Sequence, residues 1–185
     1  MNGDVRIALP EEAATLSTLE AGTKVLLSGV IYTMRDAGHA RCLAYLREHG
    51  ELPFGLTGQV LFYAGPTPER AGRPFGAIGP TTASRMDFAA PELYRAGIVS
   101  TIGKGKRSRE VVDACRICKA TYLACVGGVA ALLAERVVHA TCVAWEDLGT
   151  EALWRIEVED LPAFVEVDAT GRDLYREIEA SADPA

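Results

Sequence analysis

Apolar runs bounded by glycine, proline or polar residues recur along the whole chain, and runs of this kind predict buried strands. Over the first two thirds of the chain they lie at residues 5–9, 24–33, 58–63, 98–102 and 121–126. Nearer the C-terminal end, strands that would close the sheet are predicted at residues 137–143, 153–158 and 163–167.

Amphipathic segments separate most of these strands. In residues 39–49, Leu43 and Leu46 share one helical face while Arg47 and Glu48 are left for solvent, and Gly50 ends the segment. Further helices are predicted at residues 88–96, 107–120 and 128–136.

Strands and helices alternate through the middle of the chain, whereas both ends are richer in strands. This order favours an α/β fold with a mixed sheet over a simple doubly wound sheet. With 185 residues, of which 49% are hydrophobic, the chain can bury one sizeable core, so we expect a single domain over residues 1–185. Residues 177–185 are predicted to be a frayed acidic tail.

Charge and hydropathy exclude several classes of protein. A formal net charge of -6 argues against nonspecific binding of nucleic acid, which needs a basic surface. No uninterrupted apolar run approaches the roughly 18 residues of a membrane span, and the N-terminal residues lack the layout of a secretory signal. We therefore expect a soluble, cytoplasmic protein that binds neither nucleic acid nor membrane.

The five cysteines predict reduced thiols rather than a disulfide framework, since their number is odd and no signal peptide is evident. Cys115 and Cys118 have C-x-x-C spacing but no second pair. A structural role for these cysteines is therefore favoured over a metal or redox site. Cys125 and Cys142 lie in apolar runs, where free cysteine behaves as a small hydrophobe. No metal ligand set is predicted in this chain.

Candidate chemistry gathers in a turn opened by Gly79 and Pro80, which holds hydroxyls, a guanidinium and a carboxylate within residues 79–87. Thr81 precedes Arg85 by four residues, so an anion entering the loop could meet a hydroxyl, loop amides and a fork-shaped guanidinium. The alternative is structural: Thr81 or Thr82 would cap the following turn, and Arg85 would pair with Asp87 on the surface.

Two other polar segments follow predicted strands directly, where α/β sheets place ligand contacts. Arg35 follows the strand at residues 24–33, with Asp36 and His39 close enough to orient it. The alternative is a helix start at Asp36 with a solvated His39, and for His39 alone this alternative is favoured. Lys104 lies between Gly103 and Gly105 and could offer its ammonium group to a carboxylate. The alternative is that it belongs to a solvated basic turn. The spacing of the glycines does not fit a phosphate loop.

The order of these three segments resembles the beta subunit of the class I, iron-sulfur-dependent fumarate hydratase and L(+)-tartrate dehydratase family, equivalent to the C-terminal domain of the single-chain enzymes. The resemblance also includes Tyr63-Ala64-Gly65-Pro66, the glycine pair within residues 122–128, and the segments at residues 148–152 and 168–175. It therefore covers nearly the whole chain.

The resemblance implies a three-layer swivelling β/β/α domain with a mixed sheet, and a hydro-lyase that adds or removes water on a small dicarboxylate, above all fumarate or L-malate. Arg35, Arg85 and Lys104 match the family's substrate-contacting residues, and Thr81 matches a threonine that moves a proton. Supporting positions around them are Asp36, His39, Thr82 and Asp87.

The resemblance further implies a 4Fe-4S cluster that is held by an alpha subunit and not by this chain, in an assembly of two alpha and two beta subunits. Three alternatives stay open at this point: an L(+)-tartrate dehydratase beta subunit, a mesaconate hydratase beta subunit, and a stand-alone anion-binding module without catalysis. The sequence does not decide the preferred dicarboxylate, the stereochemistry, the stoichiometry or a redox role for Cys115 and Cys118.

Overall fold

A computed structural model describes residues 4–70 and 72–182 of the chain. Its strands are β1 (Val5–Leu9), β2 (Lys24–Thr33), β3 (Val60–Phe62), β4 (Ser100–Gly103), β5 (Thr121–Ala124), β6 (Val137–Ala144) and β7 (Leu153–Val167). Its α-helices are α1 (Asp36–His49), α2 (Ala90–Arg95), α3 (Arg109–Cys118), α4 (Ala130–Ala134) and α5 (Leu174–Ala182). Short 3-10 helices are η1 (Ala13–Thr18), η2 (Pro53–Gly55), η3 (Ala83–Met86) and η4 (Glu146–Glu151).

The sheet is mixed, which confirms the predicted α/β class. Strands β1 to β4 each pair in parallel with the next strand along the chain, while β7 runs antiparallel to β2, β5 and β6. Because β7 pairs with both β2 and β5, the pairings β2–β3–β4–β5–β7 close into a ring. The parallel strands β2, β3 and β4 therefore bring their carboxyl ends to one edge.

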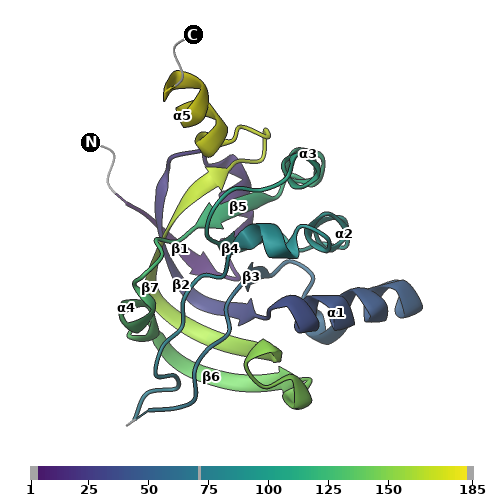
Figure 1. The fold of residues 1–185 in the computed structure, drawn as a ribbon, viewed down its shortest axis with the longest axis vertical. Coiled ribbons are helices and arrows are strands. Elements are labelled where there is room, and N and C mark those ends of the chain that lie inside the picture. Colours follow the sequence, from purple (N-terminus) through teal and green to yellow (C-terminus); the bar gives the residue numbers. More distant parts are fainter. Residues whose placement is uncertain (1–3, 71, 183–185) are drawn as a thin grey trace.

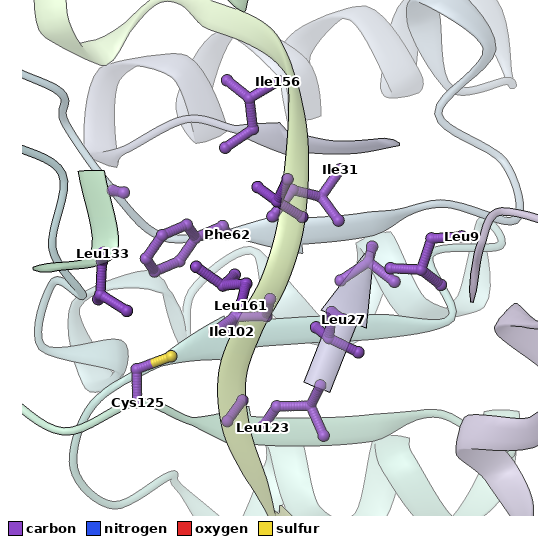
Figure 2. Close-up of a cluster of buried hydrophobic side chains, with 14 of the residues drawn as sticks. Leu9, Leu27, Ile31, Phe62, Ile102, Leu123, Cys125, Leu133, Ile156 and Leu161 are labelled. Carbon is purple, nitrogen blue, oxygen red and sulfur yellow. The ribbon is translucent and has the colours of Figure 1, made fainter. Parts of the chain in front are cut away.

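Two hydrophobic cores lie on opposite faces of the parallel strands. Phe62, Ile102 and Leu123 point into the first core, where they meet β2 and β7 side chains such as Leu27 and Ile156 (Figure 2). The alternate residues Leu61 and Tyr122 point the other way, into a second core that α1, α2 and α3 cover (Figure 1). Burial on both faces explains the continuous apolar runs of β3 to β5.

The last strand differs from its prediction. The sequence indicated two strands, at residues 153–158 and 163–167, but β7 is one strand of 15 residues. A bulge at Asp160, whose φ is 48°, joins the two halves, and the register against β2 shifts at the same place. The Asp160 amide donates to Ser28 Oγ at 3.0 Å, which keeps the bulge bonded to β2.

The predicted frayed tail is a helix over most of its length. Residues expected to fray from Glu177 onward continue α5 as far as Ala182, although α5 buries none of its side chains. The Arg172 guanidinium donates to Glu177 from Nε and Nη2 at 2.6 and 2.9 Å, and the Asp173 carboxylate accepts from the Arg176 amide at 3.0 Å. Residues 183–185 lie outside the described part of the chain. Within that part, no helix is long and apolar enough to cross a membrane.

Candidate functional site

The carboxyl ends of β2, β3 and β4 lie next to one another, because β3 pairs in parallel with both neighbours. Arg35 follows β2, the segment at residues 63–65 follows β3, and Lys104 follows β4. Two of the three polar segments that the sequence singled out thus meet at one edge of the sheet, where open α/β sheets bind ligands.

The third segment is bonded between two of these strand ends. The Thr81 amide donates to the Tyr63 carbonyl at 2.7 Å, and the Thr81 carbonyl accepts from the Lys104 amide at 3.1 Å. The Ala83 amide then donates to the Lys104 carbonyl at 2.9 Å. Thr81 is half-buried and Thr82 is exposed. The backbone at Thr81 is therefore fixed by the sheet edge rather than left as a free loop.

Arg85 pairs with Asp36, not with Asp87, so the predicted structural alternative for Arg85 is wrong in its partner. Arg85 Nε and Nη2 donate to the two Asp36 carboxylate oxygens at 3.0 and 2.7 Å. Arg35 Nε lies 3.9 Å from the same carboxylate. Asp36 thus joins the two guanidinium groups, although 49 positions separate Asp36 from Arg85.

Asp87 lies beneath this cluster and belongs to a buried ion pair. Its carboxylate accepts from Arg107 Nε at 2.8 Å and from the Ser108 amide at 2.7 Å. The Arg107 side chain is fully buried, and its guanidinium carbon lies 5.2 and 4.6 Å from the ring centroids of Tyr63 and Tyr122. The sequence places Arg107 only at the start of the helix predicted at residues 107–120, because nothing in its local pattern indicates burial.

His39 is buried, so the favoured sequence interpretation of a solvated histidine is wrong. His39 Nδ1 lies 2.8 Å from the Arg35 carbonyl, and its ring meets the Tyr63 ring edge-on at 5.1 Å. A carbonyl only accepts, so Nδ1 carries the proton. Burial lowers the pKa of His39 to about 4, against an ordinary value of 6.5, and the neutral ring supports the start of α1.

Lys104 is exposed at the edge of the cluster. A Cβ added at Gly127 would lie 3.6 Å from Lys104 Cδ and 3.9 Å from Nζ, so the lysine side chain passes over Gly127. Thr82, Lys104 and Gly127 line a hollow of about 430 Å³ together with Tyr175. Among the described residues, no hydrogen bond or ion pair joins the Lys104 side chain to Arg35 or Arg85, and backbone bonds from Thr81 and Ala83 connect Lys104 to the Arg85 loop.

Glu151 is a member of the cluster that sequence reasoning missed. It ends η4, and its Oε2 accepts from the Ala37 amide at 2.7 Å while Oε1 lies 3.7 Å from Arg35 Nη2. In the sequence, Glu151 stands out only as part of the segment at residues 148–152. No motif spacing connects it to Arg35, which lies more than a hundred positions earlier.

The cysteines of this chain do not fit an iron-sulfur cluster. Within residues 4–70 and 72–182, no group of three or more Cys, His, Asp or Glu could hold a metal ion. Burial raises the pKa values of Cys42, Cys115 and Cys125 to about 12, so these thiols are protonated at neutral pH. All five cysteines are free thiols.

These features define an α/β domain with a cluster of two arginines, a lysine and a threonine at the carboxyl ends of its parallel strands. The family model described as "Fumarase C-terminus" matches residues 2–178, and the chain belongs to this family.

The relatives described below differ in how much of their own length this chain covers. The anaerobic class I fumarate hydratase of Escherichia coli strain K12 is 41% identical over 177 residues, which cover 95% of this chain and 32% of the relative. Fumarate hydratase 2 of Leishmania major is 40% identical over 93% of this chain and 31% of its own length. The chain thus spans about a third of these relatives. A putative L(+)-tartrate dehydratase subunit beta of Methanocaldococcus jannaschii is 35% identical, with 86% of this chain and 85% of the relative covered.

Proposed function

We propose that this chain is the beta subunit of a hydro-lyase that reversibly adds or removes water on a small dicarboxylate, with fumarate and L-malate as the substrate pair. Three findings support the proposal: membership of the Fumarase C-terminus family, similarity to fumarate hydratases, and the arrangement of Arg35, Arg85 and Thr81. The domain would correspond to the family's swivelling β/β/α fold.

The observation that carries the proposal is the contact between Arg85 and Asp36. Both Asp36 oxygens lie within hydrogen-bonding distance of Arg85 Nε and Nη2, at 3.0 and 2.7 Å. This is the bidentate geometry that arginine uses for any carboxylate. A substrate carboxylate would bind here by displacing Asp36 or by sharing the two arginines with it.

The chemical roles follow from charge and position. Arg35 and Arg85 would hold one carboxylate of the substrate, and Lys104 would offer its ammonium group to the other. Thr81 would move a proton at the carbon next to a carboxylate. A threonine hydroxyl is a weak base by itself, so it needs a desolvated site and a nearby carboxylate. We infer that a partner chain supplies that carboxylate and closes the site.

The partner would be an alpha subunit, and the name of the M. jannaschii relative, a subunit beta, supports this. The 4Fe-4S cluster implied for class I enzymes would belong to that subunit, since the cysteines here do not fit it. When bound there, the cluster would supply Lewis-acid chemistry at the substrate hydroxyl. A closed assembly of two alpha and two beta subunits is proposed on grounds of symmetry.

The test is anaerobic co-expression of this chain with the product of its genomic neighbour, followed by absorbance assays of the purified complex. Hydration of fumarate by the complex, with none by this chain alone, is the expected result. Hydration at an enzymatic rate by the iron-free chain alone would refute the shared site.

A second candidate is the L(+)-tartrate dehydratase beta subunit, which the M. jannaschii relative favours because it matches this chain over most of both lengths. The same clamps would also fit mesaconate, since a methyl or hydroxyl group is selected by the pocket wall rather than by the carboxylate contacts. Parallel assays with L-tartrate and mesaconate separate these substrates. A stable complex inactive on all three would point to another hydroxy-dicarboxylate, whereas a chain that forms no complex with an alpha subunit would favour the stand-alone anion-binding module.

Replacing Thr81 tests its role in proton transfer. Thr81→Ala in the assembled complex is expected to lower kcat by about 10² to 10⁴, because positioned acid-base groups contribute on that scale. Dicarboxylate binding should change much less, since the backbone contacts of Thr81 with Tyr63 and Lys104 remain. Ser84→Ala, an exposed hydroxyl in the same loop, is the matched control. An unchanged kcat in Thr81→Ala would remove Thr81 from the mechanism.

A further inference from the structure

Glu151 reaches the start of α1 from a distant part of the chain. The residue before α1, Arg35, makes no capping bond with its own side chain, so the first amides of α1 depend on other partners. Glu151 Oε2 accepts from one of them, the Ala37 amide, at 2.7 Å. A carboxylate at this place also offsets the positive end of the helix dipole.

The same carboxylate faces Arg35. Glu151 Oε1 lies 3.7 Å from Arg35 Nη2, within ion-pair distance but too far for a hydrogen bond. Asp36 lies similarly far from Arg35, at 3.9 Å from Nε. Arg35 Nε is buried and has no hydrogen-bond partner among the described residues. Arg35 is thus flanked by two carboxylates that attract its charge without using its donors.

Backbone packing confines the aliphatic part of Arg35. A Cβ added at Gly65 would come within 2.6 Å of Arg35 Cδ and 3.2 Å of the Thr150 carbonyl, so Arg35 runs through a slot between Gly65 and the η4 turn. A Cβ at Gly38 would lie 2.5 Å from the Glu151 carbonyl, which shows how closely η4 approaches α1. The η4 turn therefore lies against the aliphatic part of Arg35 and also places Glu151 beside its guanidinium.

We propose that Glu151 is a positioning residue that aims the Arg35 guanidinium at the substrate carboxylate. Two Arg85 nitrogens donate to Asp36, whereas the Arg35 guanidinium lies 3.7 and 3.9 Å from Glu151 and Asp36, too far for hydrogen bonds. Of these two carboxylates, Glu151 is the one that Arg85 does not use. An incoming carboxylate would find Arg35 already oriented, so less side-chain entropy would be lost on binding. This inference rests on the proposed function.

The variant that isolates the role is Glu151→Gln. Its amide oxygen can still accept from the Ala37 amide, so the cap on α1 is kept, but the negative charge beside Arg35 is lost. The matched control is Asp147→Asn, in the same η4 turn. Asp147 accepts from Arg41 Nη1 and Nη2 at 2.7 and 2.8 Å, so the control also removes a charge between η4 and α1, but away from Arg35.

Two measurements are made on each variant. The first is nitrogen-15 relaxation of the Arg35 Nε–H group in the chain alone, assigned by its loss in Arg35→Lys. The second is kcat and KM for fumarate and L-malate in the anaerobically assembled complex, with circular dichroism to confirm folding. In Glu151→Gln we expect a mobile Arg35 side chain and a KM raised about tenfold, with a smaller change in kcat, as for a binding contact. Asp147→Asn should match the wild type in both.

An Arg35 group as ordered in Glu151→Gln as in the wild type would overturn the proposal, and so would lost order with an unchanged KM. If Glu151 only capped α1, Glu151→Gln would leave both readouts unchanged, because its amide oxygen keeps the bond to the Ala37 amide. If the wild-type complex turns over no dicarboxylate, the proposed function is wrong, and the relaxation result alone then decides whether Glu151 orders Arg35.

Discussion

Arg107 is a charged side chain that is fully buried beneath the candidate site. Its guanidinium is out of contact with water, pairs with Asp87 and donates to Thr101 Oγ1 and the Tyr63 hydroxyl at 3.2 and 3.3 Å. It also lies against the faces of two tyrosine rings. Because Asp87 and Tyr63 flank the loop that holds Thr81 and Arg85, the position of that loop depends on this buried pair.

Arg107→Lys is expected to destabilise the chain by about 2 to 4 kcal/mol. Lysine keeps the charge but loses the fork and the planar stacking, which leaves the buried Asp87 poorly paired. Urea unfolding of the chain alone measures the change. Arg47→Lys is the matched control, because Arg47 pairs with Glu92 at 2.6 Å with its side chain 64% exposed. The control should cost less than about 1 kcal/mol. Equal costs for the two variants would contradict this account of Arg107.

Sequence reasoning found the residues whose type reveals their chemistry and missed those whose role depends on burial. Arg35, Asp36 and Arg85 were selected from polar segments after predicted strands, and the structure brings them together, while their roles stay predictions. Arg107 and Glu151 were missed because each acts through a partner that the chain pattern does not reveal. His39 was placed in solvent for the same reason, since no local pattern shows that Tyr63 covers it.

At the scale of elements, α1 and η4 fit together so closely that one methyl group would separate them. A Cβ at Gly38 would meet the Glu151 carbonyl at 2.5 Å and Met34 Cβ at 2.9 Å. Alanine normally stabilises a helix interior by about 0.5 to 1 kcal/mol relative to glycine. Here the clash is with the backbone of η4, which cannot move without shifting Glu151 and the start of β7.

Gly38→Ala is therefore expected to destabilise the chain by about 1 to 3 kcal/mol, opposite in sign to the helix propensity. Urea unfolding monitored by circular dichroism gives the difference. Gly127→Ala serves as the control, because its Cβ would meet only Lys104 at ordinary contact distances of 3.6 and 3.9 Å. A Gly38→Ala variant as stable as the wild type would show that η4 adapts, and would weaken the case for a rigid Glu151.

Strands and helices of the middle of the chain were the most predictable elements, since β2 has the predicted bounds, β3 and β5 lie within their predicted runs, and β4 ends one residue beyond its run. Their burial on both faces leaves an unbroken apolar signal. The β7 bulge was missed because Asp160 and Pro162 read as a break, while pairing with β2 keeps the strand continuous. The helix α5 was missed because it buries nothing, and ion pairs such as that of Arg172 hold its first turn.

At the scale of the whole molecule, two buried ionisable groups give opposite dependences of stability on pH. His39 has its pKa lowered from 6.5 to about 4, chiefly by burial. Glu166, in β7, has its pKa raised from 4.5 to about 8 by burial and by the nearby Asp173 carboxylate. Arg107 and Tyr122 also face Glu166.

The sign of each contribution follows from proton binding in the two states. As pH falls from 6.5 towards 4, the unfolded chain protonates His39 and the folded chain does not, so stability falls. As pH rises from 4.5 towards 8, the unfolded chain releases the Glu166 proton and the folded chain keeps it, so stability falls again. Each full effect is roughly 3 to 5 kcal/mol.

The two slopes cancel where both ranges overlap, so these groups predict a plateau of stability at mildly acidic pH. Above the ordinary pKa of histidine only the Glu166 contribution remains, and the free energy of unfolding should fall by about 1.4 kcal/mol per pH unit until near pH 8. Urea unfolding at about pH 5, pH 6.5 and pH 8 would measure this for the wild type.

Glu166→Gln should abolish the loss of stability between pH 6.5 and pH 8. His39→Gln, which can still donate to the Arg35 carbonyl, should instead extend the decline down to the lowest pH. If Glu166→Gln and the wild type lose stability equally between pH 6.5 and pH 8, Glu166 is ionised in the folded chain and the buried-proton account of this face of the sheet is wrong.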